Sequence, residues 1–148
     1  MGDGSIAAFD TKYHYNLWRP QTAIRNGDID GNRDTVGDPE WSPLISTPAF
    51  PSYASAHATL SGAARAVLEP TLGKRGHAIT LSNPTLPGIV LDYTAWKEIT
   101  DDIDDARVYG GIHFRFDQEA GARQGRQVGR YILRNHLRSA DDGDFDDD

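Results

Sequence analysis

Residues 51–57 read Pro51-Ser-Tyr-Ala-Ser-Ala-His57 and lead into an alanine-rich stretch, Ala58–Leu68. The proline favours an extended approach, and the alanine-rich stretch is typical of a helix. Ser55 then falls near the N-cap, where free backbone N–H groups around Ala56 and His57 can bind an anion. Taken alone, the stretch fits an ordinary serine cap with a surface histidine better than an anion site.

A pair of cationic residues lies upstream, in the stretch Lys12-Tyr-His-Tyr-Asn-Leu-Trp-Arg19-Pro20. On a continuous helix, which turns by about 100° per residue, residues 12 and 19 lie about 20° from the same bearing. We therefore expect Lys12 and Arg19 to reach one pocket from two stacked turns. The arginine offers a planar fork to an anion, and the lysine offers a point charge. Pro20 disfavours helical geometry at Arg19 and predicts a kink or helix end there.

A third segment, Arg107-Val-Tyr-Gly-Gly-Ile-His113, adds another cation and a second histidine. On one helix these two side chains would lie about 120° apart, but Gly110-Gly111 predicts a break between them. Asp117 follows His113 by four residues, so its carboxylate can accept a hydrogen bond from one ring nitrogen and leave the other nitrogen available. Together the three segments indicate a site for a tetrahedral or trigonal-bipyramidal oxyanion such as phosphate or vanadate.

In this order and at these spacings, the segments resemble the signature of the vanadium haloperoxidase and type 2 phosphatidic acid phosphatase superfamily, written KxxxxxxRP, PSGH and SRxxxxxH. The chain is most similar to the vanadium chloroperoxidases, through residues 48–59, the loop Gly37–Trp41 and the segment His113–Asp117. The likeness runs from Thr11 to Gly129. It implies an all-α core like that of the superfamily, here without most of the helical region that members carry before the first motif.

The resemblance also implies roles for the matched positions, with vanadate as the cofactor and phosphate as a competing oxyanion. His113 would be the single protein ligand to the metal, and Asp117 would orient its ring. His57 would act as the acid–base residue, and Lys12 would polarise bound peroxide. Phe50 matches an aromatic residue that lines the halide site. The equatorial oxygens of the anion would be bound by Lys12, Arg19, Ser55, the N–H of Ala56, and Arg107.

Two positions depart from the superfamily pattern. Ala56 replaces the glycine of PSGH, so a Cβ lies where the backbone approaches the oxyanion. If that position needs a positive φ, alanine costs stability or moves the N–H donor. Ala106 replaces the serine before Arg107, which we expect to matter less.

The leading hypothesis is a vanadate-dependent haloperoxidase that oxidises halide with hydrogen peroxide to hypohalous acid, which halogenates a small organic acceptor. An acid phosphatase is the first alternative: His113 would attack phosphorus and His57 would protonate the leaving alcohol. The second alternative is a truncated or inactive helical fragment, which the short N-terminal region and Ala56 favour. The motif residues do not separate the first two, whereas Phe50 and Trp18 favour the haloperoxidase.

Composition narrows the class of partner. The chain has 148 residues, no cysteine and a net charge of −7, but six of its aspartates lie in residues 141–148. Residues 1–140 hold 16 acidic and 15 basic side chains, and a nearly neutral body favours a small buried anion over a nucleic acid. No apolar run is long enough for a membrane span or a signal peptide. We therefore expect a soluble protein with no membrane or nucleic-acid partner and leave its localisation open.

The sequence predicts one helical domain over residues 1–140 and a disordered acidic tail over residues 141–148. Strand signals are poor, so we expect a bundle of about four helices joined by long loops. The loops are expected at 27–54 and 73–90, and the helices at roughly 3–18, 55–69, 91–109 and 116–138.

Three glycines, Gly121, Gly125 and Gly129, recur at intervals of four in the last predicted helix. Glycine is a poor helix former, so this stripe predicts that another helix packs very closely there. With few residues before the first motif, we expect uncovered apolar faces and a homodimer or higher oligomer. The stripe is the candidate contact, although it can equally face the chain's own core.

Overall fold

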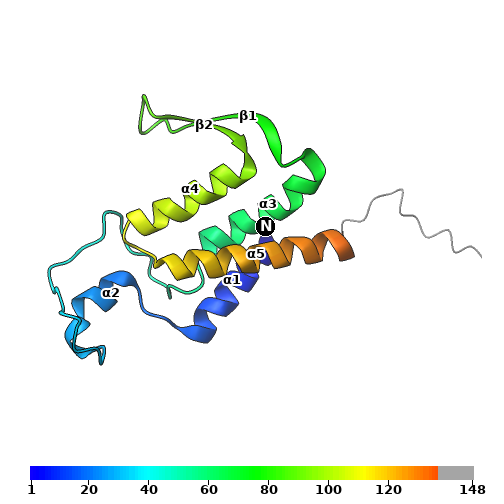
Figure 1. The fold of residues 1–148 in the computed structure, drawn as a ribbon. Helices are drawn as coiled ribbons and strands as arrows, with labels where there is room; N and C mark the ends of the chain where they lie inside the picture. The colour runs from blue at the N-terminus through cyan, green and yellow to red at the C-terminus, as the bar shows by residue number, and fades with distance from the viewer. Residues whose placement is uncertain (137–148) are drawn as a thin grey trace, which may run out of the picture.

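The computed structural model of the chain describes residues 1–136, which form a helical bundle with one small hairpin (Figure 1). The predicted helical bundle with long loops is confirmed. The predicted tail at residues 141–148 lies outside the described residues. In chain order the elements are α1 (Gly2–Tyr15), α2 (Pro20–Arg25), the short 3-10 helix η1 (Gly27–Ile29), α3 (Ala56–Leu72), β1 (Arg75–Ser82), β2 (Val90–Ala95), α4 (Trp96–Tyr109) and α5 (Arg115–Asn135).

Helices α3 and α5 pack against each other through the glycine stripe. A Cβ on Gly125 would lie 2.1 Å from the carbonyl oxygen of Thr59, and a Cβ on Gly121 or Gly129 would lie 2.5 or 2.7 Å from a backbone oxygen of the same region. No side chain fits at these distances, so glycine is needed for the close approach. The predicted close helix contact is confirmed. The stripe faces the chain's own core, and its use as a dimer contact is wrong.

The first helix ends sooner than predicted. Asn16 is left-handed, with φ 46° and ψ 40°, and α1 ends at Tyr15. Arg19 is extended, with φ −83° and ψ 158°, and it forms the N-cap of α2, whose first residue is Pro20. The continuous helix predicted over residues 3–18 is therefore wrong at its C-terminal end. The break next to Pro20 is confirmed, because proline favours the first position of a helix.

An antiparallel hairpin replaces part of the loop predicted over residues 73–90. Strands β1 and β2 pair with Ile79 opposite Tyr93, and α4 begins at Trp96 rather than at residue 91. Most hairpin residues are exposed. Apolar and polar residues alternate over 79–82 and 91–95, a strand signal that the prediction of a loop followed by a helix overlooked.

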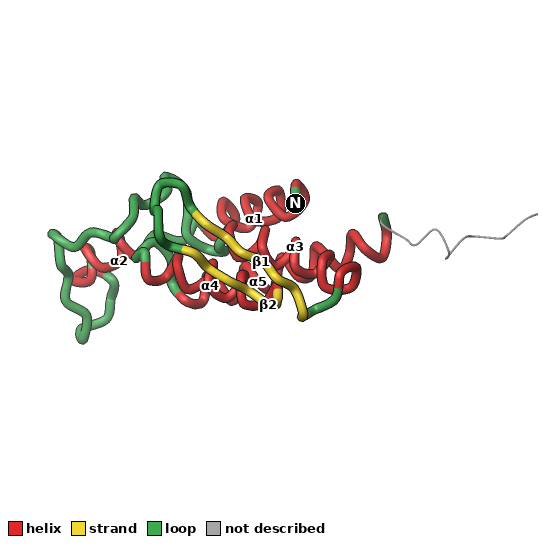
Figure 2. The backbone as a smooth tube through the Cα atoms, turned by 90° about the horizontal axis from the view of Figure 1, so that it is seen from above, coloured by secondary structure: helices red, strands yellow, loops and turns green. Residues whose placement is uncertain are grey.

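The bundle gathers the ends of four helices on one side. Figure 1 shows the C-terminal ends of α1 and α4 and the first turns of α3 and α5 on the side where α2 lies, and Figure 2 shows α2 and its loops at that same end. Among residues 1–136, none of the helices combines the length and the apolar composition that a bilayer crossing requires. The three motif segments all end at this side of the bundle.

Candidate active site

Two buried cations converge on the loop that leads into α3. The ammonium of Lys12, a residue with 0% exposure, donates to the carbonyl oxygens of Pro51 and Ser52 at 2.9 and 2.8 Å. Arg19 Nε donates to the carbonyl oxygen of Phe50 at 2.9 Å. Three consecutive carbonyl groups thus hold both cations. Their convergence is as predicted, but it comes from two separate segments and not from stacked turns of one helix.

The aromatic ring of Phe50 lies beside both cations. Its centroid is 5.2 Å from Lys12 Nζ and 5.1 Å from Arg19 Cζ, which is within the range of cation–π attraction. The ring of Phe9 packs edge-on against it, with 5.2 Å between the centroids. The structure therefore places Phe50 at the site, and its contact with halide stays a prediction.

His113 is fixed by a buried carboxylate. Its Nδ1 lies 2.8 Å from Asp117 Oδ2, and the same oxygen accepts hydrogen bonds from Ser52 Oγ at 2.5 Å and from the Phe114 N–H at 3.1 Å. Because the carboxylate only accepts, Nδ1 carries the proton and Nε2 keeps its lone pair. The predicted hydrogen bond between Asp117 and one ring nitrogen is present. Sequence reasoning missed Ser52, because the motif spacing singled out only Ser55.

The other ring nitrogen of His113 contacts the guanidinium of Arg19. His113 Nε2 lies 3.0 Å from Arg19 Nη1, which also donates to the carbonyl oxygen of Ile112 at 2.8 Å. Two buried donors, Arg19 Nη2 and Arg107 Nε, have no hydrogen-bond partner among residues 1–136. Buried polar groups without partners are rare in proteins. A bound oxyanion would supply both missing acceptors.

A turn between α4 and α5 brings Arg107 and His113 to the same side. Arg107 lies in the last turn of α4. Gly111, with φ 74°, turns the backbone away from the axis of α4 before α5 begins at Arg115. A Cβ on Gly111 would also lie 3.1 Å from the ring of Trp41. Because only glycine accepts both conditions easily, the predicted break at Gly110-Gly111 is confirmed.

Burial and mutual repulsion shift the titratable groups of the site in one direction. Burial, and next the charge of Arg19, lowers the pKa of Lys12 to about 7. Burial also lowers the pKa of Arg19 to about 10 and that of His113 to about 4. For His57, burial and then the charges of Arg107, Lys12 and Arg19 lower the pKa. An anion among these groups would relieve the repulsion.

The start of α3 supplies backbone donors. Ser55 is fully buried, and its Oγ accepts from the Ala58 N–H at 3.4 Å, which confirms the predicted N-cap. Ala56 is the first residue of α3. Among residues 1–136, Asn16 is the only residue other than glycine with a positive φ. Ala56 therefore needs no left-handed backbone, and its Cβ brings no strain of that kind.

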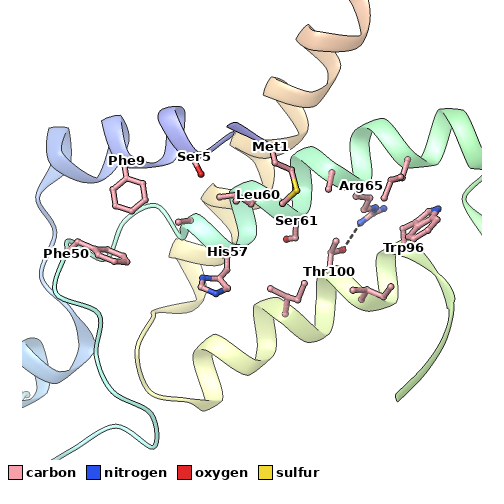
Figure 3. Close-up of a pocket in the computed structure, with 15 residues that line it drawn as sticks. Met1, Ser5, Phe9, Phe50, His57, Leu60, Ser61, Arg65, Trp96 and Thr100 are labelled. Carbon is pink, nitrogen blue, oxygen red and sulfur yellow. Dashed lines mark hydrogen bonds between the residues drawn. The ribbon is translucent and has the colours of Figure 1, made fainter. Parts of the chain in front are cut away.

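A largely apolar groove of about 620 Å³ runs between α1, α3 and α4. In Figure 3, His57 lies at the end of this groove near Phe50 and Phe9, and Trp96 lies at its other end. The two histidines of the site thus differ in their surroundings. His113 belongs to the buried polar cluster, whereas His57 borders an apolar surface.

Comparison with known proteins identifies the family. A family model described as the VCPO second helical-bundle domain matches residues 1–142. The chain belongs to this family. The predicted membership of the vanadium haloperoxidases is confirmed by this match and by the relatives. One relative, the vanadium chloroperoxidase of Curvularia inaequalis, is 35% identical over 71 residues, covering 41% of this chain and 11% of that protein.

Solved structures show the same fold. The crystal structure described as the first bacterial vanadium-dependent iodoperoxidase superposes with a TM-score of 0.74 at 34% identity, covering 89% of this chain and 30% of that one. An apo-type bacterial vanadium-dependent chloroperoxidase gives a TM-score of 0.73 at 22% identity, covering 93% and 35% of the two chains; at this identity the likeness shows the fold alone. The chain spans about one third of the length of these structures.

Proposed function

We propose that this chain forms the vanadate-binding part of a haloperoxidase, which oxidises halide with hydrogen peroxide. One observation carries the proposal: Arg19 Nη2 and Arg107 Nε are buried without acceptors among residues 1–136, beside an imidazole that is oriented by Asp117. The names of the relatives, which include a vanadium chloroperoxidase and a vanadium-dependent iodoperoxidase, support vanadate as the oxyanion.

The residues present fit vanadate. Lys12, Arg19 and Arg107 would neutralise its oxygens, and the Nε2 lone pair of His113 would ligate the metal. Ser55 and the N–H of Ala56 would complete the set of donors at the start of α3. Within residues 1–136 no group of three or more His, Asp or Glu side chains is arranged to chelate a metal cation. One imidazole with several cations suits an oxyanion rather than a bare metal ion.

The other residues would manage protons and position the halide. Vanadate, when bound, would supply the Lewis acidity that activates hydrogen peroxide. The imidazole of His57, neutral because its pKa is lowered by burial and then by neighbouring cations, would accept the proton that peroxide loses. The Lys12 ammonium would polarise hydrogen peroxide, and Phe50 would give the halide an apolar contact. Small organic acceptors would approach along the groove next to His57.

A phosphatase would use the same donors. The lone pair on His113 Nε2 that ligates vanadium could instead attack phosphorus, with His57 protonating the leaving alcohol. Phosphate is therefore the competing anion for a haloperoxidase and the reacting group for a phosphatase. Measuring halide oxidation and phosphate-ester hydrolysis on the same protein distinguishes the two functions.

The test measures bromide oxidation with hydrogen peroxide, with and without orthovanadate, beside hydrolysis of a phosphate ester. We expect oxidation only with orthovanadate, and we expect inorganic phosphate to inhibit it. His113→Ala should abolish the activity, whereas the control His14→Ala, which removes an exposed histidine of α1, should retain it. Oxidation that does not depend on vanadate, or phosphate hydrolysis as the sole activity, would contradict the proposal.

A further inference from the structure

Ser52 joins the two halves of the pocket. The residue is 0% exposed, and its Oγ lies 2.5 Å from Asp117 Oδ2 and 3.3 Å from His113 Nδ1. Its main chain makes different contacts: the carbonyl oxygen accepts from Lys12 Nζ at 2.8 Å, and the N–H donates to the carbonyl oxygen of Leu17 at 2.9 Å. The side chain therefore contacts the histidine half of the pocket, and the main chain contacts the lysine half.

The carboxylate of Asp117 depends on this hydroxyl. Asp117 is 0% exposed, and Oδ2 accepts from Ser52, His113 and the Phe114 N–H, while Oδ1 has no partner among residues 1–136. Two of the three donors, His113 and the Phe114 N–H, lie just before α5, the helix that contains Asp117. Ser52 is the donor that arrives from a distant part of the chain, so it fixes the carboxylate relative to the loop before α3. A buried carboxylate requires such donors.

We propose that Ser52 is a positioning residue: by donating to Asp117 Oδ2, its hydroxyl fixes the carboxylate that accepts from His113 Nδ1 and so turns Nε2 toward the oxyanion. The two Oγ distances select this direction, because the contact with the carboxylate is the shorter one. Hydrogen-bond partners of a ligating histidine fix its tautomer and ring orientation. The identity of the ligand rests on the proposed function, whereas the ring orientation is a property of the ligand-free protein.

The chain offers matched variants. Ser52→Ala removes the hydroxyl and leaves the main-chain bond to Lys12 in place, so it disturbs one half of the pocket. Ser52→Cys keeps nearly the same side-chain volume but replaces the hydroxyl with a much weaker hydrogen-bond donor. It takes the place of Ser52→Ala in both measurements if the alanine variant does not fold. Tyr93→Phe is the control, because it removes another hydroxyl-to-aspartate bond, 2.8 Å long, from Tyr93 to Asp102. Tyr93 is buried on β2 and Asp102 lies on α4, and neither is one of the pocket residues described above.

The first readout is the nitrogen-15 NMR spectrum of the His113 ring in the ligand-free protein at pH 7.5. We expect the Nδ1-protonated tautomer in the wild type and in Tyr93→Phe. Both Ser52 variants should keep this tautomer, because Arg19 Nη1 donates to Nε2. Their Nδ1 shift should change, because the carboxylate that accepts from Nδ1 has lost the Ser52 donor. Ring shifts that stay unchanged in the folded Ser52 variants would overturn the inference, as would the same change in Tyr93→Phe.

The second readout is calorimetric titration with inorganic phosphate and with orthovanadate. Loss of a partner that orients a metal ligand typically weakens binding by 10- to 100-fold, and we expect about 10-fold for Ser52→Ala. Equal affinities in wild type and variant would overturn the inference and leave the proposed function intact. A wild type that binds neither anion would contradict the proposed function, while the nitrogen-15 shift of Nδ1 would still decide the role of Ser52.

Discussion

Lys12 and His57 lie where burial and neighbouring cations disfavour their positively charged forms. Burial and the neighbouring cations lower the pKa of Lys12 to about 7 and lower the pKa of His57. A dianion bound among these groups would offset the repulsion, so both pKa values would rise. The site should therefore take up protons when the anion binds.

Proton uptake can be measured by titrating the protein with phosphate at pH 8 in two buffers of different ionisation enthalpy. At this pH, which lies above the lowered pKa of Lys12, the ammonium is partly deprotonated in the ligand-free protein, and we expect net uptake. Lys12→Arg should remove most of it, because a guanidinium stays charged. Net proton release from the wild type would contradict the electrostatic account of the pocket.

Ala56 illustrates a departure from the family pattern that the structure tolerates. Its backbone is helical and needs no positive φ. We expect Ala56→Gly to leave the affinity for vanadate or phosphate within about two-fold of the wild type, because there is no backbone strain to relieve. A two-fold change in affinity corresponds to about 0.4 kcal/mol in the free energy of binding. The stability should fall by about 0.5–1 kcal/mol or less, because glycine is a weaker helix former. Calorimetry and urea denaturation measure both. A large gain in affinity would show that the Cβ displaces the N–H donor.

The motifs predicted that Lys12, Arg19 and His113 lie together, but they did not predict all of the contacts that hold these residues. The spacing of His113 and Asp117 is one helical turn, so their hydrogen bond follows from local geometry. Ser52 is 65 residues from Asp117, and only the folded loop before α3 brings them together. No local pattern distinguishes this serine from an ordinary loop residue.

The secondary-structure elements form the pocket through breaks between helices rather than through long continuous helices. Lys12 and Arg19 meet although Asn16 reverses the backbone between them. The seven-residue spacing predicted the right neighbours for the wrong reason, because the carbonyl groups of residues 50–52 hold both side chains. The hairpin was missed although residues 79–82 and 91–95 alternate between apolar and polar side chains, because runs this short are weak signals.

The α3–α5 contact gives a sharp test of packing. In Gly125→Ala the new Cβ would meet the carbonyl oxygen of Thr59 at 2.1 Å, so the helices must separate. We expect a loss of about 2–3 kcal/mol or more in the free energy of unfolding. Gly2→Ala is the control, because nothing lies within 4 Å of its Cβ, and it should change stability by less than about 1 kcal/mol. Urea denaturation that gives equal stabilities would contradict the close packing.

At the scale of the whole molecule, several large apolar side chains remain exposed. Leu86, Ile89 and Val90 of the hairpin region are 53%, 53% and 56% exposed, and the groove beside His57 is largely apolar. Large exposed apolar patches are rare on soluble monomers. We therefore predict self-association at micromolar concentration, measured by light scattering, and a weaker association for Ile89→Lys. A compact monomer at these concentrations would contradict the prediction.

We expect the three distant segments to form one oxyanion pocket with His113 as the ligand. The most direct test titrates orthovanadate into the wild type, His113→Ala and His57→Ala and follows the heat of binding. We expect one site per chain in the wild type, no measurable binding in His113→Ala, and retained binding without turnover in His57→Ala. Equal loss of binding in both variants, or binding that survives in His113→Ala, would contradict this expectation.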